Sequence, residues 1–165
     1  MTKIIFINGP INSGKTSVGK RLARQLQDAD FADGDDHGLD ADASLDLHIE
    51  AGLAYIERRI DSVQEAYLVV AYPLRPLDHV RLATACTRKG AAHFTVTLAP
   101  PLEIALSNRG ERILSDWERA RILDMYREGY AARPFSDLIL DTAEFDADET
   151  AKKIASTVTA SIGGS

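Results

Sequence analysis

Residues 4–16 read Ile-Ile-Phe-Ile-Asn-Gly-Pro-Ile-Asn-Ser-Gly-Lys-Thr, and this short stretch indicates the fold class of the whole 165-residue chain. Its first part belongs to an apolar, β-branched run over residues 3–8, which is too short for a helix and is typical of a buried parallel strand. The residues that follow place apolar side chains at helical spacing: Val18, Leu22, Ala23 and Leu26. The order strand, glycine turn, helix is the first unit of an α/β fold.

The turn itself, Gly9–Thr16, satisfies the pattern G-x-x-x-x-G-K-[ST] between a predicted strand and a predicted helix. In such a P-loop the glycines let backbone N–H groups face a phosphate, and the helix adds the positive end of its dipole. We expect Lys15 to reach the β- and γ-phosphates and the Thr16 hydroxyl to ligate Mg²⁺. The candidate nucleotide-binding residues of the loop are Gly9, Asn12, Ser13, Gly14, Lys15, Thr16 and Ser17. A glycine turn with a solvated Lys15 is the alternative, and the eight-residue match in this context disfavours it.

Further apolar runs alternate with helical patterns along the chain. Strands are predicted at residues 31–32, 67–71, 94–98 and 138–141. Helices are predicted at residues 46–63, 79–87, 102–108, 116–128 and 148–162, with a possible interruption at Gly52. The sequence therefore predicts a three-layer α/β/α P-loop NTPase fold, in which right-handed crossovers cover both faces of a five-stranded parallel sheet. We expect one domain over residues 1–162 and a frayed tail over 163–165.

Composition narrows the classes of partner. The chain is 45% hydrophobic and 27% charged, which is ordinary for a soluble domain. A net charge of −6 disfavours nucleic-acid binding, and no apolar stretch approaches the roughly 18 residues of a membrane helix, so we expect a cytoplasmic protein without membrane contact. Lys and Arg are absent between Gln25 and Glu57, where nine carboxylates fall, so this segment is a distinct acidic region.

Two aspartates stand directly after the second predicted strand. Asp33 and Asp35 form a D-x-D arrangement behind Phe31 and Ala32. Side chains two residues apart on an extended chain share a face, and ligands of parallel sheets bind beyond the carboxyl ends of the strands. Both carboxylates are therefore expected to face one cleft. An aspartate-rich surface turn is the alternative, and the P-loop in the same chain favours the functional interpretation.

With these motifs in hand, the chain resembles the shikimate kinase and gluconate kinase group of small P-loop phosphotransferases over essentially its full length. Chloramphenicol phosphotransferase-like proteins are a related comparison. The segments that carry the resemblance are Gly9–Thr16, Phe31–Asp35, Asn108–Arg112 and Leu138–Thr142. The resemblance implies ATP and Mg²⁺ as cofactors, and transfer of the γ-phosphoryl group to a hydroxyl of a small molecule.

The same resemblance implies roles for particular residues. Asp33 would help to hold Mg²⁺, and Asp35 would contact the acceptor hydroxyl, either as its base or as a positioning residue. Arg109 and Arg112 would belong to a lid at about residues 109–116 that closes over ATP and stabilises charge on the transferring phosphoryl group. The alternative for the two arginines is an exposed pair at a helix end. The predicted catalytic residues are thus Lys15, Asp35, Arg109 and Arg112.

Departures from the family pattern leave the acceptor open. Where shikimate kinases have a glycine triplet after the third strand, this chain reads Ala71-Tyr72-Pro73-Leu74-Arg75, which weakens shikimate as a substrate. Arg75 could imitate a basic residue of gluconate kinases. The acidic region would repel an acid, so a neutral or cationic polyol, nucleoside or aminated antibiotic is favoured.

Several alternatives remain open at the level of sequence. A nucleotide-binding regulatory protein or slow NTPase would carry the same loop, although no guanine-selecting N-K-x-D sequence is present. An inactive relative that keeps the loop as a structural element is a third possibility. Preference for ATP over GTP, and monomer against homodimer, leave no trace in the sequence.

Overall fold

A computed structural model provides the structure of the protein and describes residues 1–162. Five strands form one sheet in the order β2-β3-β1-β4-β5, and every neighbouring pair is parallel. The strands are β1 (Lys3–Asn8), β2 (Ala29–Asp33), β3 (Tyr67–Ala71), β4 (Ala92–Leu98) and β5 (Leu138–Leu140). The predicted fold class, a five-stranded parallel sheet between helical layers, is confirmed.

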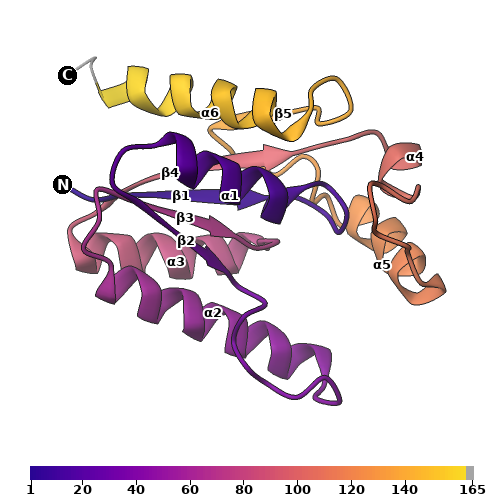
Figure 1. The fold of residues 1–165 in the computed structure, drawn as a ribbon. Helices are drawn as coiled ribbons and strands as arrows, with labels where there is room; N and C mark the ends of the chain where they lie inside the picture. The colour runs from indigo at the N-terminus through magenta and orange to yellow at the C-terminus, as the bar shows by residue number, and fades with distance from the viewer. Residues whose placement is uncertain (163–165) are drawn as a thin grey trace.

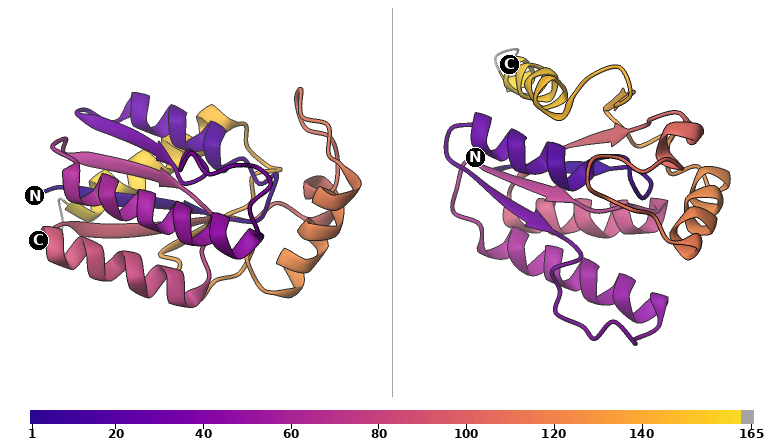
Figure 2. Two further views of the ribbon diagram at one scale, coloured as in Figure 1. Left: turned by 90° about the horizontal axis from the view of Figure 1, so that it is seen from below. Right: turned by 45° about the vertical axis from the view of Figure 1, so that its right-hand side comes forward.

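Helices cover both faces of the sheet (Figure 1). They are α1 (Lys15–Gln25), α2 (Leu45–Ser62), α3 (Pro76–Lys89), α4 (Leu102–Ala105), α5 (Asp116–Arg127) and α6 (Ala147–Ile162). Helices α1 and α6 lie together on one face, and α2 and α3 on the other. Helix α5 and the segment leading into it lie beyond the carboxyl ends of the strands (Figure 2), where they can border a ligand site.

The central strand β1 shows why its sequence is apolar without interruption. Ile4 and Phe6 pack into the core beneath α2 and α3, whereas Ile5 and Ile7 pack into the core beneath α1 and α6. All four side chains are at most 1% exposed. A strand that is buried on both faces has no polar side to show, so the usual alternation is lost.

Three predicted helices differ in extent from the observed ones. Helix α2 runs unbroken through Gly52. The absence of a side chain at Gly52 makes room for Tyr72. Helix α3 begins at Pro76 rather than at residue 79, since proline at a first helical position loses no intrahelical hydrogen bond. The helix predicted over residues 102–108 is the short α4.

The carboxyl ends of three strands bring residues that are distant in sequence to one edge of the sheet. β1 leads into Gly9, β2 ends at Asp33, and β3 is followed by Tyr72. The backbone N–H of Tyr72 donates to Ile7 O, which extends the sheet pairing to this edge. Within residues 1–162, every helix is too short or too polar to cross a lipid bilayer.

Candidate active site

The P-loop, residues 9–16, is held in a curl by contacts with the segment after β4. Asn12 adopts φ 65° and Gly14 φ 97°, both in the left-handed region. The Asn12 side-chain amide donates to Ala105 O and Ser107 O, each over 2.8 Å, and so fixes the loop to α4. Both side-chain N–H groups of Asn12 are therefore engaged within the protein, so its backbone N–H is the donor that remains for a phosphate.

The first glycine of the loop and Ser13 pack beneath it. A Cβ at Gly9 would lie 2.6 Å from Ser13 Oγ and 2.7 Å from Leu98 O, so only glycine fits. Ser13 is fully buried, and its Oγ is the one buried side-chain polar atom without a hydrogen-bond partner in residues 1–162. Its carbonyl accepts a hydrogen bond from the Thr142 hydroxyl over 3.0 Å. Gly9 and the Ser13 side chain thus shape the loop from below.

Lys15 begins α1 and carries an ammonium group suited to a phosphate. Its Nζ donates to Pro10 O over 2.7 Å. Burial lowers the pKa of Lys15 from 10.5 to about 8; Asp35 opposes this shift and Arg112 adds to it. A desolvated cation with incomplete compensation is stabilised by an incoming anion, so the loop and this side chain together fit a phosphate.

Thr16 and Asp33 offer oxygen atoms for a metal ion. The Thr16 hydroxyl donates to Asp33 Oδ2 over 2.7 Å, and Asp33 Oδ1 accepts from the backbone N–H of Asp35 over 2.9 Å. In the described part of the chain, no group of three or more His, Cys, Asp or Glu side chains could hold a metal. Mg²⁺ is usually bound by one or two protein oxygens together with phosphates and water, so this pair fits Mg²⁺ better than a metal that needs a full protein cage.

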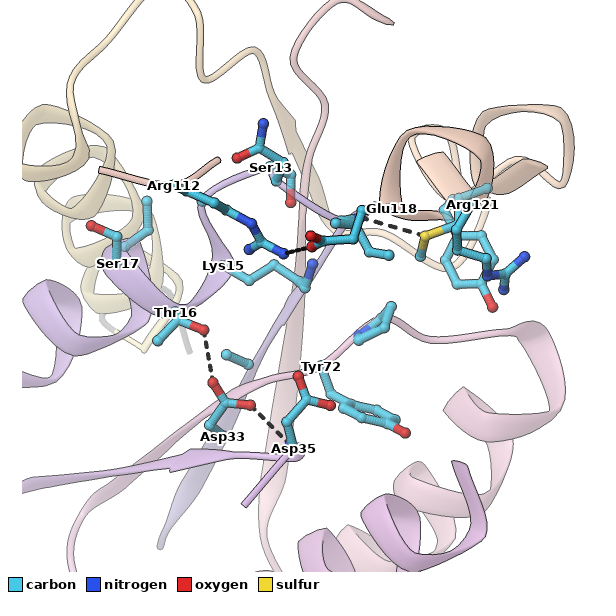
Figure 3. Close-up of a pocket in the computed structure, with 18 of the residues that line it drawn as sticks. Ser13, Lys15, Thr16, Ser17, Asp33, Asp35, Tyr72, Arg112, Glu118 and Arg121 are labelled. Atoms are coloured by element: carbon cyan, nitrogen blue, oxygen red, sulfur yellow. Dashed lines mark hydrogen bonds and ion pairs between the residues drawn. The ribbon is translucent and has the colours of Figure 1, made fainter. Parts of the chain in front are cut away.

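Asp35 faces the same space from the side of β2. Figure 3 shows its carboxyl group between Asp33 and Tyr72, below Lys15. Burial raises the pKa of Asp35, the charge of Asp33 raises it further, and Lys15 lowers it. Lys15 and Asp35 each shift the pKa of the other, so their charged groups lie within electrostatic reach.

The two predicted lid arginines make different contacts. Arg109 donates to Asn12 O over 2.8 Å and to Thr142 O over 3.3 Å, and so bridges the P-loop to the segment after β5. Arg112 pairs with Glu118 over 2.5 Å, and Figure 3 shows this pair above Lys15. Arg112 is the arginine whose charge reaches the Lys15 ammonium.

A single cleft of about 1080 Å³ connects these groups. The predicted site residues that line it are Asn12, Ser13, Gly14, Lys15, Thr16, Ser17, Asp33, Asp35, Arg109 and Arg112. Gly9 is the predicted residue that does not line it. The sequence interpretation did not assign a role to several other lining residues: His48, Tyr72, Trp117, Arg121 and Tyr130. They come from α2, from the segment after β3, and from α5 and the residues that follow it. No local motif points to a binding role for any of them, so only Tyr72, at the position of the family's glycine triplet, left a signal.

The comparisons with known proteins agree with this geometry. No model of a known protein family matches the sequence. Shikimate kinase of Francisella tularensis subsp. novicida is 35% identical over 115 residues, which cover 67% of this chain and 55% of that protein. The chain thus spans about half the length of the curated relatives that it matches.

Solved structures match over nearly the whole chain. Shikimate kinase from Aquifex aeolicus has a TM-score of 0.70 at 19% identity, covering 98% of this chain and 99% of that one. A gluconokinase from Sinorhizobium meliloti has a TM-score of 0.69 at 18% identity, covering 95% of each chain. At these identities the structures establish the fold. In sequence the chain is similar to shikimate kinases over 115 residues, and in fold it is similar to P-loop small-molecule kinases such as shikimate kinase and gluconokinase.

Proposed function

We propose that the protein is an ATP- and Mg²⁺-dependent phosphotransferase that transfers the γ-phosphoryl group to a hydroxyl of a small molecule. The observation that carries this proposal is the placement of Lys15 and Asp35 in one cleft, within electrostatic reach of each other. A cation for the phosphate and a carboxylate for the alcohol are the two groups that a direct transfer requires.

The chemistry divides among the residues as follows. Backbone N–H groups of the P-loop and the Lys15 ammonium would hold the phosphates. Thr16 and Asp33 would hold Mg²⁺, which would supply positive charge next to the phosphates. The acceptor oxygen forms a bond to the γ-phosphorus as the bond to the β–γ bridging oxygen breaks, and ADP leaves. The acceptor proton passes to the Asp35 carboxylate, whose raised pKa makes it a better base than an exposed aspartate.

Arg112 supports the transfer from the opposite side of the cleft. Its guanidinium is within electrostatic reach of the Lys15 ammonium, and both cations lie near the position expected for the terminal phosphate. Fixed positive charge at that position stabilises the transition state. Arg109, which bonds two backbone carbonyls of the site, orders the P-loop against the segment after β5.

A coupled ADP-release assay with ATP, Mg²⁺ and libraries of alcohols tests the proposal. We expect ADP release that depends on one class of acceptor and that Lys15→Ala abolishes. Release that no acceptor accelerates would identify a slow NTPase instead. Failure to bind any nucleotide in calorimetry would leave the loop a structural element.

A further inference from the structure

The end of the cleft beyond Asp35 has a distinctive lining. We call this part the acceptor side and define it by five residues: Asp35, Tyr72, Arg75, Arg121 and Tyr130. If the proposed function holds, the alcohol that receives the phosphoryl group must bind here, because Asp35 is its proton acceptor. The chemistry of this lining therefore selects the substrate class.

Two buried tyrosines of the acceptor side have no polar partner. Tyr72 is 6% exposed and Tyr130 is 4% exposed, and both line the cleft. In residues 1–162 no protein atom hydrogen-bonds either hydroxyl, yet neither hydroxyl is wholly sealed from solvent. Buried hydroxyls are normally paired, so these two are available to a ligand.

Both phenols are neutral over the whole working range of pH. Burial raises the pKa of Tyr72, and the nearby charge of Asp35 raises it further. Burial likewise raises the pKa of Tyr130. A neutral phenol both donates and accepts a hydrogen bond, which suits an uncharged hydroxyl, and its ring offers an apolar face.

The arginines of the acceptor side already have carboxylate partners. Arg75 contacts Asp78 through two bonds, Nε to Oδ2 over 2.8 Å and Nη2 to Oδ1 over 2.9 Å. Arg121 contacts both carboxylate oxygens of Glu128, over 3.2 and 3.3 Å. An acidic substrate would compete with Asp78 or Glu128 for these guanidinium groups while lying next to the Asp35 carboxylate, and both effects oppose its binding.

Apolar side chains also line the cleft. They include Ala41, Ala43, Leu45, Ile49, Pro73 and Trp117. Leu45 is 49% exposed and Trp117 is 62% exposed, although both are large apolar residues. A ligand with an apolar ring or chain would cover this surface, whereas a compact, fully polar ligand would leave it in water.

We infer that the acceptor is an uncharged alcohol with an apolar ring or chain, and that Tyr72 and Tyr130 determine this specificity by hydrogen-bonding its hydroxyls. Because the arginines of the acceptor side already have carboxylate partners, sugar acids and other carboxylates should bind more weakly than their neutral counterparts. The inference rests on the proposed function for the identity of the site, but it concerns binding and can be tested without turnover.

Matched pairs of compounds provide the test. Phenyl β-D-glucoside is neutral and carries a CH₂OH group where the acidic phenyl β-D-glucuronide carries a carboxylate. Methyl shikimate is the neutral ester of the acid shikimate. Trp117 is the only tryptophan of the chain and lines the cleft, so its fluorescence reports occupancy, with calorimetry as a second readout. With ADP bound, we expect the neutral member of at least one pair to bind about 10-fold more tightly than its acid, or better.

Variants identify the residues responsible. Tyr72→Phe and Tyr130→Phe keep the rings and remove the hydroxyls, so each is expected to raise the Kd of the neutral ligand about 5- to 10-fold without changing the Kd of ADP. Tyr67→Phe, at the other end of β3 and outside the cleft, is the matched control and should change neither. Glu128→Gln frees Arg121 and should narrow the preference for neutral over acidic ligands about 10-fold.

Three outcomes would overturn the inference. The first is equal or tighter binding of the acidic members. The second is absence of binding by every neutral member up to about 10 mM while ADP still binds, because a cleft built for such alcohols should retain at least millimolar affinity. The third is unchanged affinity in both tyrosine variants. None of these results depends on phosphoryl transfer, so a protein that binds neutral alcohols but phosphorylates none of them would contradict the proposed function and leave intact the inferred preference of this cleft for neutral ligands.

Discussion

The Thr16 hydroxyl donates a hydrogen bond to Asp33 Oδ2 over 2.7 Å and so joins the first turn of α1 to the last residue of β2. The two residues are far apart in sequence and meet because β1 and β2 both end at the same edge of the sheet. Each offers an oxygen to a hard divalent cation. The proposed metal ligands Thr16 and Asp33 thereby connect the P-loop to the segment that carries Asp35, the proposed acceptor carboxylate.

Replacement of Asp33 by asparagine should weaken the metal site selectively. The amide keeps an oxygen that can accept from the Asp35 N–H, but the negative charge is lost. The Mg²⁺ concentration for half-maximal activity should rise about 10-fold or more, since Mg²⁺ is held mainly by carboxylate and phosphate oxygens. A Mg²⁺ titration of activity measures this effect. Asp36→Asn, which removes the same charge outside the cleft, serves as the control and should leave the titration unchanged.

The lowered pKa of Lys15 predicts that nucleotide affinity depends on pH in the alkaline range. Below about pH 8 the free protein carries the ammonium that binds phosphate, and above it the amine is neutral. The Kd of ADP should therefore rise, approaching about tenfold per pH unit above pH 8, and binding near pH 8 should take up a proton. Calorimetry in buffers of different ionisation enthalpy measures both quantities.

Arg112 provides a check on this rise of the Kd of ADP above pH 8, which we call the alkaline limb. Its positive charge is one cause of the lowered pKa of Lys15, so Arg112→Ala should move the limb to higher pH. An alkaline limb that stays in place in both Arg112→Ala and Lys15→Arg would assign the titration to another group.

The central strands β1 and β3 were predictable from the sequence because they are buried on both faces. Their apolar runs, such as residues 67–71 in β3, have no polar face and stand out between helical patterns. The end of α4 was not predictable, because it depends on a distant residue. The Asn12 side-chain amide of the P-loop donates hydrogen bonds to the carbonyls of Ala105 and Ser107, and so provides partners for the end of that helix. Local periodicity carries no information about such a partner.

The P-loop was predictable from the sequence because, unlike the end of α4, it depends on local residues alone. The P-loop is a continuous motif in which each residue type has a task at a fixed spacing. The acceptor side is assembled from single residues of separate segments, such as Tyr72 after β3 and Tyr130 after α5. Neither tyrosine belongs to a local pattern, and only the fold shows that they share a cavity with Asp35.

Asp35→Asn should separate catalysis from nucleotide binding. If the carboxylate accepts the acceptor proton, kcat should fall about 100-fold or more, while the Kd of ADP changes little.

In the wild type, activity should be lost toward acid as this carboxylate becomes protonated, at a pH above the ordinary aspartate value, because burial and Asp33 raise its pKa. Since the Asp33 charge contributes to that rise, Asp33→Asn should move the acid limb to lower pH. A pH–rate profile at saturating Mg²⁺ measures both shifts, and an unchanged kcat in Asp35→Asn would remove the base assignment.

Gly34 lies between the two aspartates and has no room for a side chain. A Cβ there would lie 2.2 Å from Tyr72 Cδ2, and the Tyr72 ring also packs closely on Gly52, where an added Cβ would lie 2.6 Å from the Tyr72 hydroxyl. Gly34→Ala should therefore cost about 1–3 kcal/mol of unfolding free energy and lower Tm by several degrees, as overpacking of a rigid core does. Because relief of the clash must displace either the ring or the backbone next to Asp35, kcat should fall as well.

Gly38→Ala, whose Cβ would meet nothing but whose φ is 80°, should lose about 1 kcal/mol through backbone strain alone and keep its kcat. Thermal unfolding and turnover of the two variants, compared directly, would show whether Tyr72 holds Asp35, the proposed base, in place or only packs beneath it.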